Sequence, residues 1–194
     1  MNDVERAARA IDDGELVVYP TETVYGLGAD ATDAAAVERV FETKGRSRDK
    51  PVSLGVSSVE RATEYTRLTE RERAFMREFL PGPVTVVVER REVVPDALTA
   101  GRDRVGVRIP DHEVALALLE AADAPVTATS ANVSGTGSVR RLDALGDQVR
   151  EAAAVLLDGG ETPGGGSTVV DVEAGTVHRR GAAADAIDEW LATH

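Results

Sequence analysis

Residues 15–28 read ELVVYPTETVYGLG, and this stretch contains the strand-to-loop change that decides the fold. The apolar run at 15–19 predicts a buried strand, which Pro20 ends because proline has no N–H to donate within a sheet. Two threonines and a glutamate follow, and two glycines close the stretch. Loops at strand ends commonly hold ligands, since a rigid sheet positions them. Local chemistry alone modestly favours an ordinary tight connection over a ligand site.

Strands and helices are interspersed along the rest of the chain. Hydrophobic periodicity predicts helices at 4–13, 33–44, 69–80, 111–122 and 183–192, the third opened by the capping box Thr69-x-x-Glu72 and the fourth capped by Asp111. β-Branched runs predict strands at 52–56, 84–89, 104–109, 126–129, 153–157, 168–172 and 176–179. Strict βα alternation is lacking, so we expect an α/β fold on a twisted mixed sheet with flanking helices. Clusters of Pro and Gly are interpreted as turns inside one domain, residues 1–194.

Length and composition limit the class of protein. The chain has 194 residues, enough for one ordinary domain, and 42% hydrophobic residues, which excludes disorder as its dominant state. It has no cysteine, which excludes disulfides, cysteine-ligated zinc and a thiol nucleophile. The three histidines are scattered and form no metal-ligand spacing. No apolar run approaches the roughly 20 residues of a membrane span, so we expect a cytoplasmic domain without membrane attachment.

The charge is strongly acidic, with 34 Asp and Glu against 22 Lys and Arg and a net charge of −12. Such a surface repels nucleic-acid phosphates unless its positive charge is concentrated in one place. Twenty of the basic residues are arginine and only two are lysine. One hypothesis is a high-salt cytoplasm, where dense carboxylates keep a protein hydrated. The alternative is a GC-rich genome, which explains the arginine bias but not by itself the acidic excess.

A basic loop, residues 44–51 (KGRSRDKP), holds four cations within seven residues and contains both lysines. Lysine and arginine are the donors that phosphate prefers, so a polyphosphate is the natural ligand. A solvated basic face at a helix C-terminus and a chance cluster are the alternatives. The scarcity of lysine elsewhere favours the ligand site. Since exposed cations rarely support a fold, Lys44→Ala or Arg46→Ala should reduce turnover with little change in melting temperature.

Two turns rich in small residues follow predicted strands, at 127–135 (TATSANVSG) and 164–168 (GGGST). Their hydroxyls and backbone N–H groups suit an anion, but each turn alone is equally typical of ordinary turn chemistry. Arg179 and Arg180 end the last strand, where single arginines are usually solvated. Neither a P-loop nor a dinucleotide-binding fingerprint occurs in the chain.

Six motifs, taken in order along the chain, resemble the YrdC/Sua5 family. The match spans roughly residues 4–181, and the resemblance implies an α/β domain with a twisted mixed sheet and a concave, positively lined cavity. The motifs are residues 19–28, Lys44-Gly-Arg46 with Lys50-Pro51, Pro81-Gly82-Pro83-x-Thr85, Val107-Arg108-Ile109-Pro110, Ser130-Ala-Asn132-x-Ser134-Gly135 and Ser167-Thr168-Val169-Val170-Asp171.

The resemblance also implies a reaction, in which L-threonine, bicarbonate and ATP give threonylcarbamoyl-AMP and pyrophosphate. That product serves the N6-threonylcarbamoyl modification of adenosine 37 in tRNA and is used by a separate transferase complex. Strong direct binding of nucleic acid is therefore not expected, which agrees with the net charge of −12. Magnesium would arrive with ATP, and no side chain of the sequence is assigned to it.

Site residues follow from the matched motifs. By resemblance, the catalytic set is Lys44, Arg46, Ser130 and Asn132; Lys44, Arg46, Lys50, Ser138 and Arg179 contact the nucleotide; and Thr23, Arg108 and Ser167 hold threonine. Arg108 suits the threonine carboxylate. No side-chain nucleophile is needed, so we expect no covalent enzyme intermediate.

The chain departs from the family pattern in two places. Many longer members have a histidine where this chain has Gly55, which puts one threonine contact in question. The additional C-terminal domain of long members is not expected. A paralogue of hydrogenase maturation is an alternative, although those proteins carry cysteine-rich modules. A non-catalytic RNA-binding or ribosome-associated module is a further alternative, favoured by the basic loop and opposed by the acidic remainder.

Overall fold

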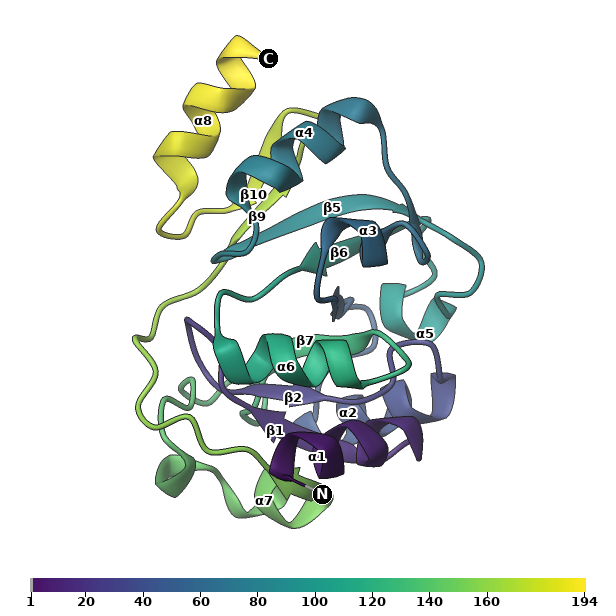
Figure 1. Cartoon of the computed structure of the whole chain (residues 1–194), viewed down its shortest axis with the longest axis vertical. Coiled ribbons are helices and arrows are strands. Elements are labelled where there is room, and N and C mark those ends of the chain that lie inside the picture. Colours follow the sequence, from purple (N-terminus) through teal and green to yellow (C-terminus); the bar gives the residue numbers. More distant parts are fainter. Residues whose placement is uncertain (1) are drawn as a thin grey trace.

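The computed structural model describes residues 2–194, and Met1, the first residue of the predicted domain 1–194, lies outside them. The described residues form a mixed sheet of ten strands with flanking helices (Figure 1). Its strand order is β10-β9-β5-β6-β3-β7-β2-β1-β8, and β4 pairs with β5 outside this path. Both parallel pairs, such as β3 with β6, and antiparallel pairs, such as β5 with β6, occur. The predicted α/β fold on a twisted mixed sheet is thus confirmed.

Within residues 2–194, ten strands, eight α-helices and one 3₁₀ turn make up the fold. The strands are β1 (Leu16–Tyr19), β2 (Gly26–Gly28), β3 (Ser53–Gly55), β4 (Thr66–Arg67), β5 (Val84–Arg90), β6 (Arg104–Arg108), β7 (Val126–Ser130), β8 (Ala153–Leu156), β9 (Thr168–Asp171) and β10 (Thr176–Arg179). The helices are α1 (Asp3–Asp12), α2 (Ala34–Lys44), α3 (Val59–Ala62), α4 (Glu70–Phe79), α5 (Asp96–Thr99), α6 (Glu113–Ala121), α7 (Asp147–Ala152), α8 (Ala184–Thr193) and the 3₁₀ turn η1 (Leu142–Ala144). Every predicted element is found within two residues of its bounds. The elements that sequence patterns missed, β2, α3, β4, α5, η1 and α7, are all too short to display a period.

Helix ends follow local capping chemistry. The predicted capping box of α4 is present, because Glu72 N donates to Thr69 Oγ1 at 3.1 Å and Thr69 N donates to Glu72 Oε2 at 2.8 Å. The prediction that Asp111 caps α6 is wrong. The helix begins one residue later than that cap requires, and His112 Nδ1 accepts from Val114 N at 3.2 Å instead.

One half of the sheet is covered on both faces. Side chains alternate along β1, so that Val17 and Tyr19 join a cluster with α1 and α6, whereas Leu16 and Val18 join a cluster with α2 and α7. In Figure 1, α1 and α6 lie together in front of β1, β2 and β7. This double cover makes the half that contains residues 15–28 a rigid support.

The other half, β5, β6 and β9, is covered on one face only. Val86, Val107 and Val170 pack into the largest apolar cluster, with residues of α3, α4, α5 and α8. Trp190 of α8 belongs to this cluster, and its Nε1 donates to Glu78 Oε2 at 2.8 Å. The alternate residues of these strands face the opposite side, where the sheet is open. None of the helices formed by residues 2–194 is long and apolar enough to cross a membrane.

Candidate functional site

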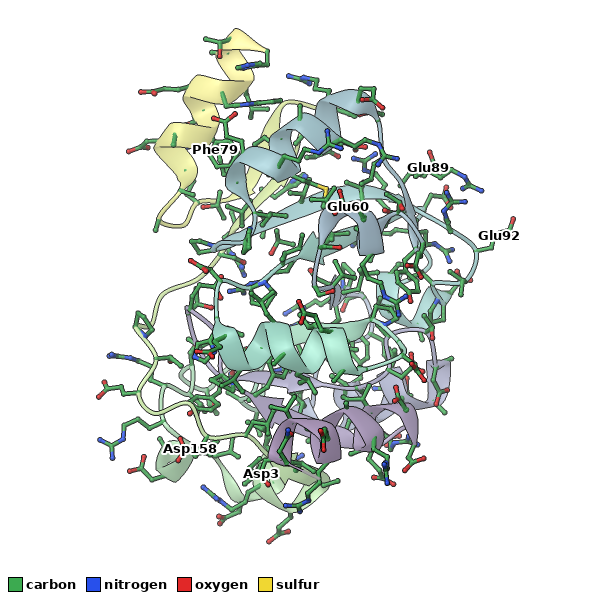
Figure 2. The ribbon with its side chains drawn as sticks, viewed as in Figure 1. Asp3, Glu60, Phe79, Glu89, Glu92 and Asp158 are labelled. Carbon is green, nitrogen blue, oxygen red and sulfur yellow. The ribbon has the colours of Figure 1, made fainter. Side chains whose placement is uncertain are left out.

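A cleft of about 550 Å³ lies on the open face of the sheet. Among the residues that the structure describes, its lining includes five arginines and one histidine but no Asp or Glu. Glu22 and Asp171 pair with arginines of the cleft without lining it, and Figure 2 shows the labelled Glu89 and Glu92 at the outer edge of the molecule. The concave, positively lined cavity expected from the resemblance is therefore present. Its arginines are Arg46, Arg102, Arg104, Arg108 and Arg179, and the histidine is His178.

The floor of the cleft is the strand β6. Its sequence RVGVR places Arg104, Gly106 and Arg108 on the cleft face, because alternate residues of a strand share a face. A Cβ atom on Gly106 would collide with Ser53 Oγ and would lie 2.9 Å from Thr85 Cγ2. Glycine is therefore required here, because the Ser53 and Thr85 side chains fill the space beside its Cα on the cleft face.

One end of the cleft is formed by the loop after β1. Arg108 Nη2 donates to Glu22 Oε1 at 2.9 Å and to Thr23 Oγ1 at 2.8 Å. The loop is fixed by Thr21, whose Oγ1 donates to Val24 O at 2.6 Å and accepts from the N–H groups of Thr23 and Val24. The tight connection favoured by local chemistry is confirmed, and the same loop places Thr23 at the cleft. Thr23 and Arg108, both predicted to hold threonine, lie side by side.

Tyr19, the last residue of β1, supports the end of the cleft that contains Thr23 and Arg108. Tyr19 is buried, and its hydroxyl donates to Thr127 O at 3.1 Å. Burial raises the pKa of Tyr19 to about 12, an effect that the nearby Arg108 opposes. Tyr19 is therefore a neutral hydrogen-bond donor here rather than a base.

The facing wall is formed by Ser167 and Arg179. Arg179 donates from Nε to Ser167 O at 2.9 Å and from Nη2 to Ser167 Oγ at 2.7 Å. Ser167 Oγ also lies 3.0 Å from Thr85 Oγ1, which fixes the serine in place. Burial lowers the pKa of Arg179, and the charge of Arg108 lowers it further. Repulsion between these two cations is relieved when an anion lies between them.

The basic loop contributes Arg46 to the cleft. Arg46 donates from Nε to Lys50 O at 2.9 Å and from Nη2 to Pro51 O at 3.0 Å, so its guanidinium is held by its own loop. Burial lowers the pKa of Arg46, and the charge of Arg179 adds to this effect. Lys50 is exposed and is not among the residues that line the cleft. The two arginines, not the lysine, thus define the cationic wall.

Lys44 differs from expectation, because its side chain is only 1% exposed. Its Nζ donates to the backbone oxygens of Ser130 and, at 2.6 Å, of Asn132. Burial lowers the pKa of Lys44 to about 8, with the charge of Arg46 as the second cause. The prediction that Lys44 is an exposed cation is wrong, because the last turn of α2 packs beneath the turn that follows β7. Its part in phosphate binding stays a prediction.

In the segment that ends β7 and follows it, some predicted residues line the cleft and others hold the shape of the turn. Ser130 and Ser138 line the cleft, whereas Asn132 does not. Asn132 Nδ2 donates to Val133 O at 2.9 Å and to Thr136 O at 3.0 Å, so this side chain shapes the turn. Its Oδ1 is buried and has no hydrogen-bond partner within residues 2–194. The structure thus brings seven predicted residues together: Thr23, Arg46, Arg108, Ser130, Ser138, Ser167 and Arg179.

Three residues of the lining, two arginines and a histidine, were missed by sequence reasoning. Arg104 shares the alternation of RVGVR with Arg108, a pattern that could have identified it, and it forms an ion pair with Asp171 at 2.9 Å. His178 directly precedes Arg179 in the chain. Arg102 lies in a loop, where no sequence pattern indicates which way a side chain points. Arg102 Nη2 donates to Asp49 O at 3.3 Å, which attaches the basic loop to the start of β6.

Gly55 also lines the cleft, beside Arg108 in the parallel pairing of β3 with β6. A Cβ atom at this position would lie 3.3 Å from Val126 O and 3.6 Å from Leu119 Cδ2. A side chain at position 55 would therefore meet close neighbours, and the threonine contact that the histidine of longer members would supply stays in question.

The open face of this α/β sheet carries a cleft lined by arginines and by no carboxylate, and this arrangement suits a protein that binds small anionic ligands. Comparison with protein families gives the particular family. The Sua5/YciO/YrdC model, described as "Telomere recombination", matches residues 9–181, and this chain belongs to that family.

Individual relatives agree with this placement. The chain is 43% identical over 168 residues to threonylcarbamoyl-AMP synthase of Pyrococcus abyssi (strain GE5 / Orsay), covering 86% of this chain and 49% of the relative. It is 34% identical over 183 residues to threonylcarbamoyl-AMP synthase of Shigella boydii serotype 4 (strain Sb227), covering 92% and 95%. The crystal structure of P. abyssi Sua5 complexed with L-threonine superposes with a TM-score of 0.85 at 41% identity, covering 92% of this chain and 54% of that one. The chain therefore spans about half the length of the Pyrococcus relative and nearly all of the Shigella one.

Proposed function

We propose that this chain is a nucleotidyltransferase that makes L-threonylcarbamoyl-AMP and pyrophosphate from L-threonine, bicarbonate and ATP. The observation that carries the proposal is the cleft, which collects five arginines and no carboxylate in a chain of net charge −12. Relatives named threonylcarbamoyl-AMP synthase, one of them matched over 95% of its length, support the same activity.

The reaction requires several anions to meet in one place. The threonine amine takes up bicarbonate or carbon dioxide to form a carbamate, whose oxygen then attacks the α-phosphorus while pyrophosphate leaves. A carboxylate, a carbamate and a triphosphate repel one another in water. Fixed guanidinium groups offset this repulsion and the charge that develops on the transferring phosphoryl group. Positioning accounts for the rate, so no covalent intermediate on the enzyme is required.

Roles for the individual residues follow from their places in the cleft. Arg108 and Thr23 would bind the threonine carboxylate, and Ser167 would border the same subsite. Arg46 and Arg179 would hold the phosphates, with Ser130 and Ser138 as hydroxyl donors to the nucleotide. Lys44 and Asn132 would contribute through the turn after β7, and Lys50 would contact the nucleotide from the edge of the cleft.

Magnesium would enter with ATP rather than occupy a site built by the protein. Within residues 2–194, no group of three or more His, Asp or Glu side chains is arranged to hold a metal ion. The cleft lining has no carboxylate, and phosphate oxygens with water are the ligands that magnesium prefers. The side chains of the cleft thus suit the anionic part of a magnesium nucleotide.

The product is a reactive mixed anhydride and would be passed to a separate tRNA threonylcarbamoyl transferase complex in the cytoplasm. The acidic exterior supports a protein that makes the activated group without binding tRNA strongly itself.

Incorporation of radiolabelled bicarbonate tests the proposal. The chain is incubated with ATP, magnesium and labelled bicarbonate, with and without L-threonine, and binding to tRNA is measured in parallel. We expect threonine-dependent formation of a labelled adenylate and weak tRNA binding. Tight tRNA binding without labelled product would support the non-catalytic RNA-binding alternative.

A further inference from the structure

The ion pair between Glu22 and Arg108 is enclosed although one member faces the cleft. Arg108 lines the cleft and Glu22 does not, and their side chains are 15% and 14% exposed. Arg108 Nη2 lies 2.9 Å from Glu22 Oε1. Breaking a pair this enclosed is costly, because the remaining charge is left without a partner. The Glu22 carboxylate, which does not line the cleft, therefore restricts the orientation of the Arg108 side chain.

Two buried atoms of this pair lack hydrogen-bond partners within the described part of the chain, namely Glu22 Oε2 and Arg108 Nε. Nε and Nη2 form one edge of a guanidinium, and the two oxygens of a carboxylate match that edge in a two-legged pair. One leg of such a pair, Nη2 to Oε1, is formed, and the two unpartnered atoms are the ones that a second leg would join. Since buried unpaired polar atoms are unfavourable, closing the second leg would satisfy both atoms and direct the side edge of Arg108 to Glu22.

The other edge of the guanidinium is available. Nη1 of Arg108 makes no hydrogen bond within residues 2–194, whereas Nη2 is shared between Glu22 and Thr23 Oγ1. An incoming carboxylate can therefore approach the end of the guanidinium that carries Nη1.

We propose that Glu22 is the positioning residue of the amino-acid subsite. It binds the side edge of Arg108, so that the end of the guanidinium faces the cleft and receives the α-carboxylate of the substrate. This inference rests on the proposed function. Glu22 acts through Arg108 and does not touch the substrate.

The test compares ligands with and without a carboxylate. Binding of L-threonine and of L-threoninamide is measured by calorimetry for the wild-type chain, Glu22→Gln and Glu22→Asp, and the KM values for threonine and ATP are measured alongside. The matched control is Glu89→Gln, which removes an exposed carboxylate that pairs with Arg67 at 3.0 Å. Figure 2 shows Glu89 at the outer edge of the molecule.

We expect Glu22→Gln to weaken threonine binding about tenfold, because the carboxylate loses a well-oriented charged donor. Threoninamide binding and the KM for ATP should change less than about twofold, so that discrimination between the two ligands largely disappears. Glu22→Asp keeps the charge and should retain part of the discrimination. Glu89→Gln should behave as the wild type.

The inference would be overturned if Glu22→Gln bound threonine as tightly as the wild type does, or if it lost the same affinity for threonine and for threoninamide. It would also be overturned if Glu22→Gln weakened the binding of threonine but not that of 3-hydroxybutyrate, which has the carboxylate and lacks the amine. If Glu22→Gln does not fold, Glu22→Asp serves as the test, because aspartate keeps the negative charge. A complete loss of discrimination between threonine and threoninamide in Glu22→Asp would contradict the idea that the charge at position 22 positions Arg108. The proposed function is judged separately, since it fails only if the wild-type chain shows no threonine-dependent turnover.

Discussion

Lys44 Nζ donates to the backbone oxygen of Asn132 at 2.6 Å and thereby joins the end of α2 to the turn after β7. The contact is reciprocal, because Ser134 N donates to Lys44 O at 2.7 Å. The basic loop and the serine-rich turn are consequently one unit. Arg46 on one segment and Ser130 on the other enter the cleft from fixed positions.

Lys44→Met should destabilise the protein. The substitution leaves the carbonyls of Ser130 and Asn132 without their donor, a cost of about 2 kcal/mol that corresponds to a fall of roughly 5 °C in Tm. The measurement is thermal unfolding monitored by circular dichroism. Lys50→Met is the control and should change the Tm by less than about 1 °C, because Lys50 is exposed. Equal Tm values for both variants would contradict the structural role of Lys44.

The stability of the wild-type chain should depend on pH through Lys44. Burial lowers its pKa from the ordinary 10.5 to about 8, so between these values the unfolded chain binds more protons than the folded one. The free energy of unfolding contributed by Lys44 therefore rises as the pH increases from about 8 towards 10.5. Urea unfolding of the wild type and Lys44→Met across this window measures it. A constant difference between the two proteins would refute the lowered pKa.

Arg46→Gln should raise the KM for ATP about tenfold, since one charged donor to the phosphates is lost. Arg48→Gln is the matched control in the same loop, because Arg48 pairs with Glu38 and does not line the cleft. Steady-state kinetics with ATP as the varied substrate give both values. Similar effects of the two substitutions would indicate that the general charge of the loop, rather than Arg46, binds the nucleotide.

The acidic exterior should make stability depend on salt if the chain is adapted to a high-salt cytoplasm. Repulsion among the surplus carboxylates is screened by KCl, so the Tm should rise markedly from low to multimolar KCl. Thermal melts over a KCl series give the answer. Equal stability at both extremes would leave a GC-rich genome as the explanation for the arginine bias.

The predicted elements were found because their signals are local. Thr69 and Glu72 form their capping box from neighbours in sequence, and the alternation of β6 already separates Val107 from Arg108. The burial of Lys44 is of another kind, because its partners lie on the turn after β7, 86 and 88 residues away. The pairing of Arg108 with Glu22 likewise depends on the strand order of the sheet. Sequence motifs identified most of the candidate site residues but not which of them line the cleft, since Lys44 and Asn132 do not.

The central claim, that the cationic cleft joins threonine, bicarbonate and ATP, is tested most directly by pyrophosphate release. The wild-type chain is assayed with magnesium ATP in the presence and absence of L-threonine and of bicarbonate, over a range of KCl concentrations. Our account predicts that pyrophosphate appears only when both threonine and bicarbonate are present. Release that is independent of threonine, or no release at any salt concentration, would contradict it.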